Sequence, residues 1–152
     1  MIGNYYQYSE KLASGAQPSE EDIAELKKDG FEVVFNISTP SAKNALANEA
    51  AIVEKQGMHY VHFPVDCSDL QSIHYKTFEG IMNGIVDKKV FVHCGANIKS
   101  SNLIHMYDVL ENGKNEKESV KTLYNIQQPE EKWFKYFESM GMKGLRIKTK
   151  ED

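Results

Sequence analysis

The chain has 152 residues, 41% hydrophobic and 26% charged, a composition typical of one folded domain with a single core. A net charge of −4 gives no broad basic surface, so neither nucleic acid nor an anionic membrane is expected as a partner, and any anion site has to be local. No apolar run approaches the roughly 18 residues that a membrane-spanning helix requires.

The predicted elements alternate between helix and strand. The segment PSEEDIAELKKDG predicts the first helix, because Ser19 and Asp22 can form a capping box and Gly30 ends the pattern. Short buried strands are predicted at 31–38, 58–66 and 88–94. Further helices are predicted at 45–57, 72–85, 100–113, 118–126 and 129–141, and the charged tail from residue 143 to 152 is expected to fray.

This alternation predicts one α/β domain over residues 1–152. Right-handed crossovers would give a mainly parallel central sheet of about four to five strands with helices on both faces. Because ligands bind just past the carboxyl ends of such strands, the predicted strand ends at Asp66 and Cys94 are the places to look for a site.

The stretch VFVHCGANIKSS places a cysteine between a strand and a helix. Amides at a helix N-terminus activate a cysteine there and also bind phosphate or sulfate. Gly95 and Ala96 leave room for the backbone to approach an anion, and Asn97 tolerates the left-handed conformation that such loops need. Lys99 adds a positive charge. The sequence therefore predicts a thiol nucleophile, Cys94, within an anion cradle.

The rest of this segment supports the cradle. Ser100 and Ser101 can cap the helix or hydrogen-bond the sulfur, while His93 is expected to be a structural histidine. The candidate phosphate-binding residues are Gly95, Ala96, Asn97, Ile98, Lys99, Ser100 and Ser101.

VFVHCGANIKSS resembles the phosphate-binding loop of the cysteine-dependent protein tyrosine and dual-specificity phosphatases, whose signature is His-Cys, five residues, Arg, then Ser or Thr. The upstream LASGAQPSEEDIAELKKDGFEVVFNIS is similar to the opening of their compact members. The loop also resembles that of a small bacterial phosphatase-like family catalogued as domain of unknown function 442, with the basic residue five positions after the cysteine. Asn97, Lys99 and Ser101 fit that spacing. The resemblance implies a dual-specificity-phosphatase-like fold.

The resemblance also implies roles for individual residues. Cys94 would be the nucleophile, Lys99 and Ser101 would assist it, and His93 would support the loop. In YVHFPVDCSDL, which is similar to the family's acid loop, Asp66 would be the general acid, with Asp69 as the fallback. A helix-capping role is the alternative for either aspartate.

The basic residue departs from the family pattern. Ser100 occupies the arginine position of the longer signature and Lys99 that of the shorter one, while the only arginine, Arg146, matches neither. A lysine is a point charge without the planar fork of arginine, so it should clamp a phosphoryl group less well. Both a weak phosphatase and a phosphate binder without turnover are consistent with this loop.

A third interpretation is a thiol enzyme of the rhodanese or arsenate-reductase type, because those enzymes also place a cysteine loop at a strand end. Cys67 is expected to be a free thiol, with a redox pair to Cys94 as the alternative. The expected partner is a phosphorylated substrate, or free phosphate or sulfate. No cofactor or metal is expected, since the histidines show no ligand spacing.

The start, MIGNYYQYSEK, lacks the basic-then-apolar pattern of a secretory signal. This favours the cytoplasm, with the periplasm open if a signal peptide has been removed. The oligomeric state and the identity of the phosphoester stay open at this point.

Overall fold

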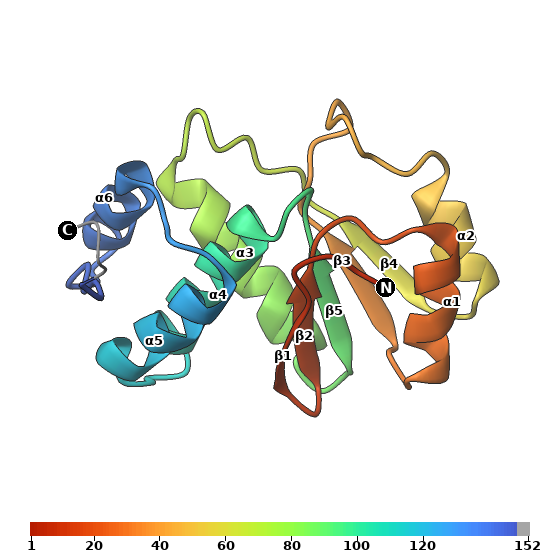
Figure 1. Cartoon of the computed structure of the whole chain (residues 1–152), viewed down its shortest axis with the longest axis horizontal. Coiled ribbons are helices and arrows are strands. Elements are labelled where there is room, and N and C mark those ends of the chain that lie inside the picture. Colours follow the sequence, from red (N-terminus) through yellow and green to blue (C-terminus); the bar gives the residue numbers. More distant parts are fainter. Residues whose placement is uncertain (149–152) are drawn as a thin grey trace.

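The structure, a computed structural model, describes residues 1–148, which form five strands and six helices (Figure 1). The strands are β1 (Tyr6–Ser9), β2 (Leu12–Gly15), β3 (Val33–Asn36), β4 (His59–His62) and β5 (Val90–His93). The helices are α1 (Glu20–Lys28), α2 (Glu49–Lys55), α3 (Ser72–Ile85), α4 (Ile98–Leu110), α5 (Glu116–Ile126) and α6 (Glu131–Ser139). The end of the tail predicted to fray, 149–152, lies outside the described residues.

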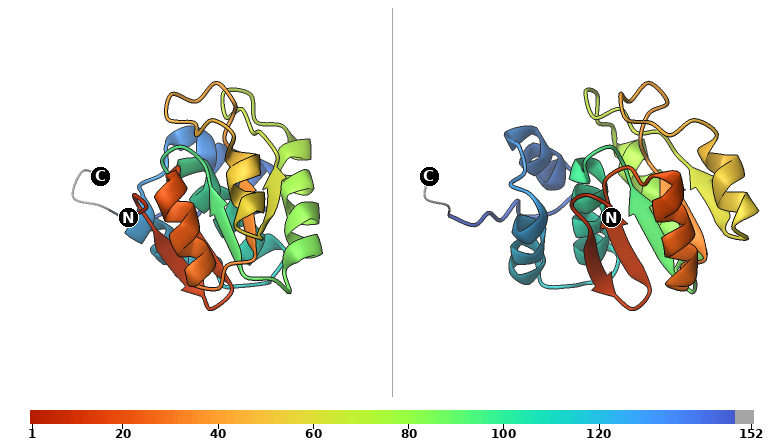
Figure 2. Two further views of the ribbon diagram at one scale, coloured as in Figure 1. Left: turned by 90° about the vertical axis from the view of Figure 1, so that its right-hand side faces the viewer. Right: turned by 45° about the vertical axis from the view of Figure 1, so that its right-hand side comes forward.

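The strands form one sheet in the order β1-β2-β5-β3-β4. The β1–β2 pair is antiparallel and the other pairs are parallel. Helices α1 and α2 cover one face, and α3 and α4 cover the other, with α5 and α6 beyond them (Figures 1 and 2). This arrangement confirms the predicted α/β fold with a mainly parallel sheet and helices on both faces.

The central strands are buried on both faces, which explains their unbroken apolar sequence. Along β3, Val33 and Phe35 join the core under α3, α4 and α6, whereas Val34 joins the core under α1 and α2. Along β5, Phe91 likewise points to the second core. Successive side chains of a strand alternate between faces, so each strand holds both layers together.

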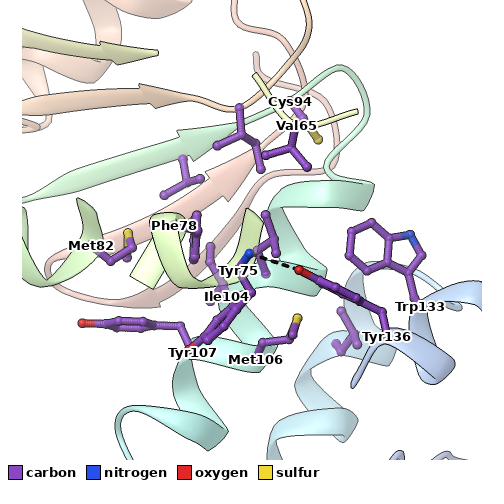
Figure 3. Close-up of a cluster of buried hydrophobic side chains, with 14 of the residues drawn as sticks. Val65, Tyr75, Phe78, Met82, Cys94, Ile104, Met106, Tyr107, Trp133 and Tyr136 are labelled. Carbon is purple, nitrogen blue, oxygen red and sulfur yellow. Dashed lines mark hydrogen bonds between the residues drawn. The ribbon is translucent and has the colours of Figure 1, made fainter. Parts of the chain in front are cut away.

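The larger core ties the C-terminal helix to the sheet (Figure 3). Phe78 and Trp133 are completely buried, and each such side chain contributes about 1.5–3 kcal/mol through removal of its surface from water. The Tyr136 hydroxyl accepts from the Tyr75 amide at 3.0 Å and donates to the Gln71 carbonyl at 2.7 Å. Helix α6 is thereby fixed against the start of α3, close to the segment that follows β4.

Several sequence predictions are confirmed, and others need correction. Ser19 forms the predicted capping box at α1, and α3 has the predicted bounds. The N-terminal β1–β2 hairpin was not predicted. Helix α4 starts at Ile98, two residues before the predicted start at Ser100, and α2 starts only at Glu49 because Asn48 has a left-handed backbone.

The segments that follow β3, β4 and β5 all rise on the same side of the sheet, at the top of Figure 1. Asn36, at the end of β3, pairs in register with His93 at the end of β5. Cys94 therefore emerges from the middle of the sheet, at the edge where ligands of parallel sheets bind. None of the helices within residues 1–148 has the length and apolar character needed to cross a membrane.

Candidate active site

Cys94 borders a cavity of about 250 Å³ at the carboxyl edge of the sheet. Four parts of the chain line it: Ser38, Thr39 and Ala42 after β3; Cys67 after β4; Cys94, Gly95, Ala96, Ile98 and Lys99 around the start of α4; and Glu130 and Trp133 at the start of α6. The structure thus places Cys94 and four of the seven candidate phosphate-binding residues at this cavity, whereas Asn97, Ser100 and Ser101 do not line it. The contributions from α6 and from the segment after β3 were not predicted from the sequence.

The carbonyl groups of the cysteine loop are held by donors outside it. The Gly95 carbonyl accepts from the Gln17 amide at 3.1 Å and from Asn44 Nδ2 at 3.0 Å. The Ala96 carbonyl accepts from Asn4 Nδ2 at 3.3 Å. In a planar trans peptide the N–H points opposite to the C=O, so the Ala96 amide, which follows the Gly95 carbonyl, points away from Gln17 and Asn44. Within residues 1–148, the Gly95 and Ala96 amides themselves have no protein acceptor.

Asn97 shapes the entry into α4. It has a left-handed backbone with φ of 65°, and its carboxamide does not cap the helix. Instead, Asn97 Nδ2 donates to the Asn4 carbonyl and to Ser14 Oγ, each at 2.9 Å. The first amides of α4 are therefore free of a side-chain cap, and a left-handed residue beside such amides is typical of an anion-binding nest.

Lys99 lines the cavity, but its ammonium group has a protein partner. Lys99 Nζ donates to the Val65 carbonyl at 2.6 Å. Val65 directly precedes Asp66, so this bond joins the cysteine loop to the segment of the predicted acid. An ammonium has three N–H donors, which leaves two of them for an anion.

The two serines after Lys99 differ in their surroundings. Ser101 Oγ donates to the Asn97 carbonyl at 2.5 Å and accepts from Gln127 Nε2 at 2.7 Å. Ser100 Oγ is buried and has no hydrogen-bond partner within the described residues. Ser101 thus fixes the loop, whereas the Ser100 hydroxyl is the one left without a protein partner.

His93 is buried and belongs to a polar network that the sequence did not predict. His93 Nε2 lies 2.6 Å from Glu49 Oε2, and Gln17 Nε2 donates to Glu49 Oε1 at 2.6 Å. Burial raises the pKa of Glu49, but the hydrogen bond and charge of His93 outweigh this and lower the pKa overall. Glu49 was missed because a glutamate in a predicted helix is usually solvated, and no local pattern links it to His93.

The two candidate acids lie on the exposed segment after β4. Asp66 Oδ1 accepts from the Ser68 amide at 2.9 Å and from Ser68 Oγ at 2.8 Å. These bonds favour the carboxylate and lower the pKa of Asp66. Asp69 Oδ1 accepts from Gln71 Nε2 at 2.7 Å. Neither carboxylate lines the cavity, although Cys67, next to Asp66, does.

Both cysteines are free thiols and line the same cavity. Cys94 is buried, and Cys67 is partly exposed, with Lys132 Nζ 3.9 Å from its sulfur. No group of three or more metal-ligating side chains occurs within residues 1–148.

Solved structures with the same arrangement include two groups of proteins. A "Putative phosphatase (DUF442)" from Shewanella putrefaciens CN-32 is 27% identical, with a TM-score of 0.79 over 92% of this chain and 90% of its own. Tk-PTP in its active form is 16% identical, with a TM-score of 0.75 over 92% of this chain and 97% of its own. TpbA of P. aeruginosa is 14% identical, with a TM-score of 0.74 over 91% and 84%.

Comparison with protein-family models gives no match, and comparison with curated proteins gives none either. The structural neighbours nevertheless include both the DUF442 group and cysteine-based phosphatases of the tyrosine and dual-specificity type. The chain therefore has a phosphatase fold, as its loop resemblance implied.

Proposed function

We propose that this chain is a phosphatase that hydrolyses phosphomonoesters through a cysteinyl-phosphate intermediate. One observation carries the proposal: Cys94 borders a cavity beside uncapped helix amides, while the carbonyls of the loop are held by Gln17, Asn44 and Asn4 on the other side. Donors fixed in advance around a nucleophile stabilise charge that develops on a bound oxyanion. The phosphatase fold of the neighbours supports the same chemistry.

In the first step, the Cys94 thiolate attacks phosphorus. The S–P bond forms, the bond from phosphorus to the ester oxygen breaks, and the departing oxygen takes a proton from Asp66. The loop amides and Lys99 hold the remaining phosphoryl oxygens. The bond between Lys99 and the Val65 carbonyl supports a role for Asp66, because it ties the acid segment to the cysteine loop.

In the second step, water attacks the cysteinyl-phosphate. Asp66, now a carboxylate, takes a proton from the water as the O–P bond forms, and Cys94 leaves as a thiolate. The Ser100 hydroxyl, buried without a protein partner, is suited to stabilise that leaving group. Inorganic phosphate is released, and the chain returns to its starting state.

We expect turnover to be slow. Arginines that contact a transferring phosphoryl group are worth about 10³–10⁵ in rate, and here a lysine takes that position. The Lys99 ammonium is also shared with the Val65 carbonyl. A lysine in this state holds a phosphate charge but gives weaker support to the spreading charge of the transition state.

Phosphate binding without turnover is the second candidate function. It is favoured by the same Lys99 contact and by the Asp66 carboxylate, which faces Ser68 and has a lowered pKa instead of the raised pKa that suits a general acid. A protein of this kind would hold a phosphorylated partner at the loop.

Activity on an aryl phosphate, measured in wild type, Cys94→Ser and Cys67→Ser, tests the proposal. Turnover that is lost in Cys94→Ser and retained in Cys67→Ser supports a cysteinyl-phosphate mechanism. Phosphate binding without turnover in wild type supports the binding function. Sulfur transfer from thiosulfate that requires Cys94 would instead support the thiol-enzyme interpretation.

A further inference from the structure

The His93 ring lies between two acceptors. Its Nε2 atom is 2.6 Å from Glu49 Oε2, and its Nδ1 atom is 3.2 Å from the Cys94 carbonyl oxygen. The histidine side chain is completely buried and the glutamate almost so, with exposed fractions of 0% and 4%. Water is therefore excluded from this contact, and the partners of both ring nitrogens are set by the protein.

The hydrogen-bond partners determine where the ring protons lie. A carbonyl oxygen can only accept, so Nδ1 has to carry a hydrogen for the contact with Cys94 to be a bond. An ionised carboxylate also only accepts, and Gln17 Nε2 already donates to the other oxygen of Glu49. With Glu49 ionised, both ring nitrogens of His93 donate, and the two side chains form a buried pair.

We infer that Glu49 is a positioning residue for the Cys94 loop: it fixes the His93 ring, which holds the Cys94 carbonyl and so directs the Gly95 amide toward the cavity. This inference rests on the proposed function in that the cavity binds a phosphoryl group. Because the C=O and N–H of one peptide point in opposite directions, holding the carbonyl on the His93 side sets the amide on the other.

Gln17 extends this control to the next peptide. Its side chain donates to Glu49, and its backbone amide donates to the Gly95 carbonyl at 3.1 Å. One residue therefore links the buried carboxylate to the orientation of the Ala96 amide. Two consecutive loop amides are fixed by a single network that starts at Glu49.

Tyr60 is a further titratable group beside this pair, and its hydroxyl interacts with the Glu49 carboxylate. Burial raises the pKa of Tyr60 to about 12, so its hydroxyl stays neutral near pH 7. Among these groups, Glu49 is the one that supplies a negative charge to His93. Replacing its carboxylate with an amide should therefore change the ring protons without removing the support for the ring.

Three variants separate positioning from general stability. Glu49→Leu removes the support, and we expect phosphate affinity to fall about tenfold, the size of one lost hydrogen bond to an anion. Glu49→Gln can still accept from Gln17 and donate to Nε2, so affinity should stay within about threefold of wild type. Glu54→Gln, an exposed glutamate on the same helix, is the matched control and should bind phosphate as wild type does. Calorimetric titration with inorganic phosphate gives these affinities.

Nitrogen NMR of labelled histidine, with the His93 signals assigned from a His93→Asn variant, gives a readout that a merely structural role would not move. We expect protons on both ring nitrogens in wild type and only on Nδ1 in Glu49→Gln. An unprotonated Nδ1 in wild type overturns the inference, and so does a folded Glu49→Leu variant that binds phosphate normally. If Glu49→Leu does not fold, the NMR result decides. Absence of turnover in wild type, with phosphate binding and the NMR result as expected, would reject the phosphatase proposal and support the positioning role.

Discussion

The Lys99 ammonium donates to the Val65 carbonyl at 2.6 Å, across the gap between the first turn of α4 and the segment after β4. The contact joins the predicted anion cradle to the residue that precedes Asp66. It also occupies one of the three N–H donors of Lys99, and that donor is then not available to a phosphoryl group. The consequences of this bond separate a weak enzyme from a binding protein.

Lys99→Arg should raise turnover on an aryl phosphate by about tenfold or more, because a guanidinium can donate two parallel hydrogen bonds to the transferring group. Lys99→Ala should lower turnover and weaken phosphate binding about tenfold. Steady-state kinetics and calorimetry measure these effects, with Lys135→Ala, an exposed lysine on α6, as the control. Loss of affinity in Lys99→Ala without any turnover in Lys99→Arg would indicate a binding site. If neither substitution changed turnover or phosphate affinity, Lys99 would take no part in the site.

Ser100→Arg tests the longer signature, in which the arginine stands one position later. The structure places Ser100 in a fully buried position within α4, with an exposed fraction of 0%. A large cationic side chain there overfills the core and loses its hydration, so we expect a loss of about 3 kcal/mol or more in the free energy of unfolding. Urea unfolding measures this. A stable and more active Ser100→Arg variant would contradict the present alignment of the loop.

Asp66→Asn should lower turnover about 10²-fold, the usual contribution of a general acid, whereas Asp69→Asn should have little effect. The reverse pattern would assign the acid to Asp69. Initial rates on an aryl phosphate with a poor leaving group give the clearest difference, because such a group needs protonation to depart.

Ser68→Ala should move the pH dependence of turnover upward. The Ser68 amide and hydroxyl favour the Asp66 carboxylate and lower its pKa, so removing the hydroxyl raises that pKa. A general acid works only while protonated, and its activity falls as pH rises through its pKa. The descending limb of the rate profile should therefore shift to higher pH in Ser68→Ala. A shift in the opposite direction would exclude Asp66 as the acid.

Local patterns predicted much of the framework. The capping box at Ser19 marked the start of α1, and the apolar run at 90–92 marked the central strand because both of its faces are buried. The resemblance of the loop indicated the fold, which the structural neighbours confirm. These signals depend on residues that are close in sequence, so a sequence alone carries them.

Features that depend on distant contacts were not predictable. The Glu49 carboxylate meets His93 only after β3 and β5 pair, and nothing near Glu49 in the sequence marks it as buried. The Lys99 contact with Val65 likewise joins residues that lie 34 positions apart in the sequence. The β1–β2 hairpin was missed because its strand sequences, YQYS and LASG, lack the valine-rich apolar runs that marked β3 and β5.

His105 should make stability fall in mild acid. Burial lowers its pKa from 6.5 to about 4 in the folded state, so the unfolded chain binds more protons between these values. Its contribution is fully present above pH 6.5 and is lost as pH falls toward 4, for a total of about 3 kcal/mol. Urea unfolding of wild type and His105→Gln from pH 7 to pH 4 measures the difference. The plot of unfolding free energy against pH should be flatter for His105→Gln than for wild type, but not for the exposed His59→Gln. Equal slopes of this plot for all three proteins would contradict the assignment.

Asn97 combines a left-handed backbone with two buried hydrogen bonds, and a second asparagine separates the two effects. Asn48 has a similar φ of 60° at the start of α2, but it is exposed and makes no capping bond. Asn48→Gly should be nearly neutral, and Asn48→Ala should cost about 1 kcal/mol for the strained backbone alone.

Asn97→Gly should cost about 2 kcal/mol, because it keeps the backbone conformation but loses the bonds to the Asn4 carbonyl and Ser14 Oγ. Asn97→Ala should cost about 1 kcal/mol more than that. Both Asn97 variants should also bind phosphate more weakly than wild type, since the bonds of Asn97 set the direction of the uncapped amides of α4, while the Asn48 variants should bind it normally. Unfolding in urea and calorimetric titration with phosphate give the two readouts. Equal costs for Asn48→Gly and Asn97→Gly, with unchanged phosphate affinity, would show that the buried carboxamide plays no part in forming the cradle around Cys94.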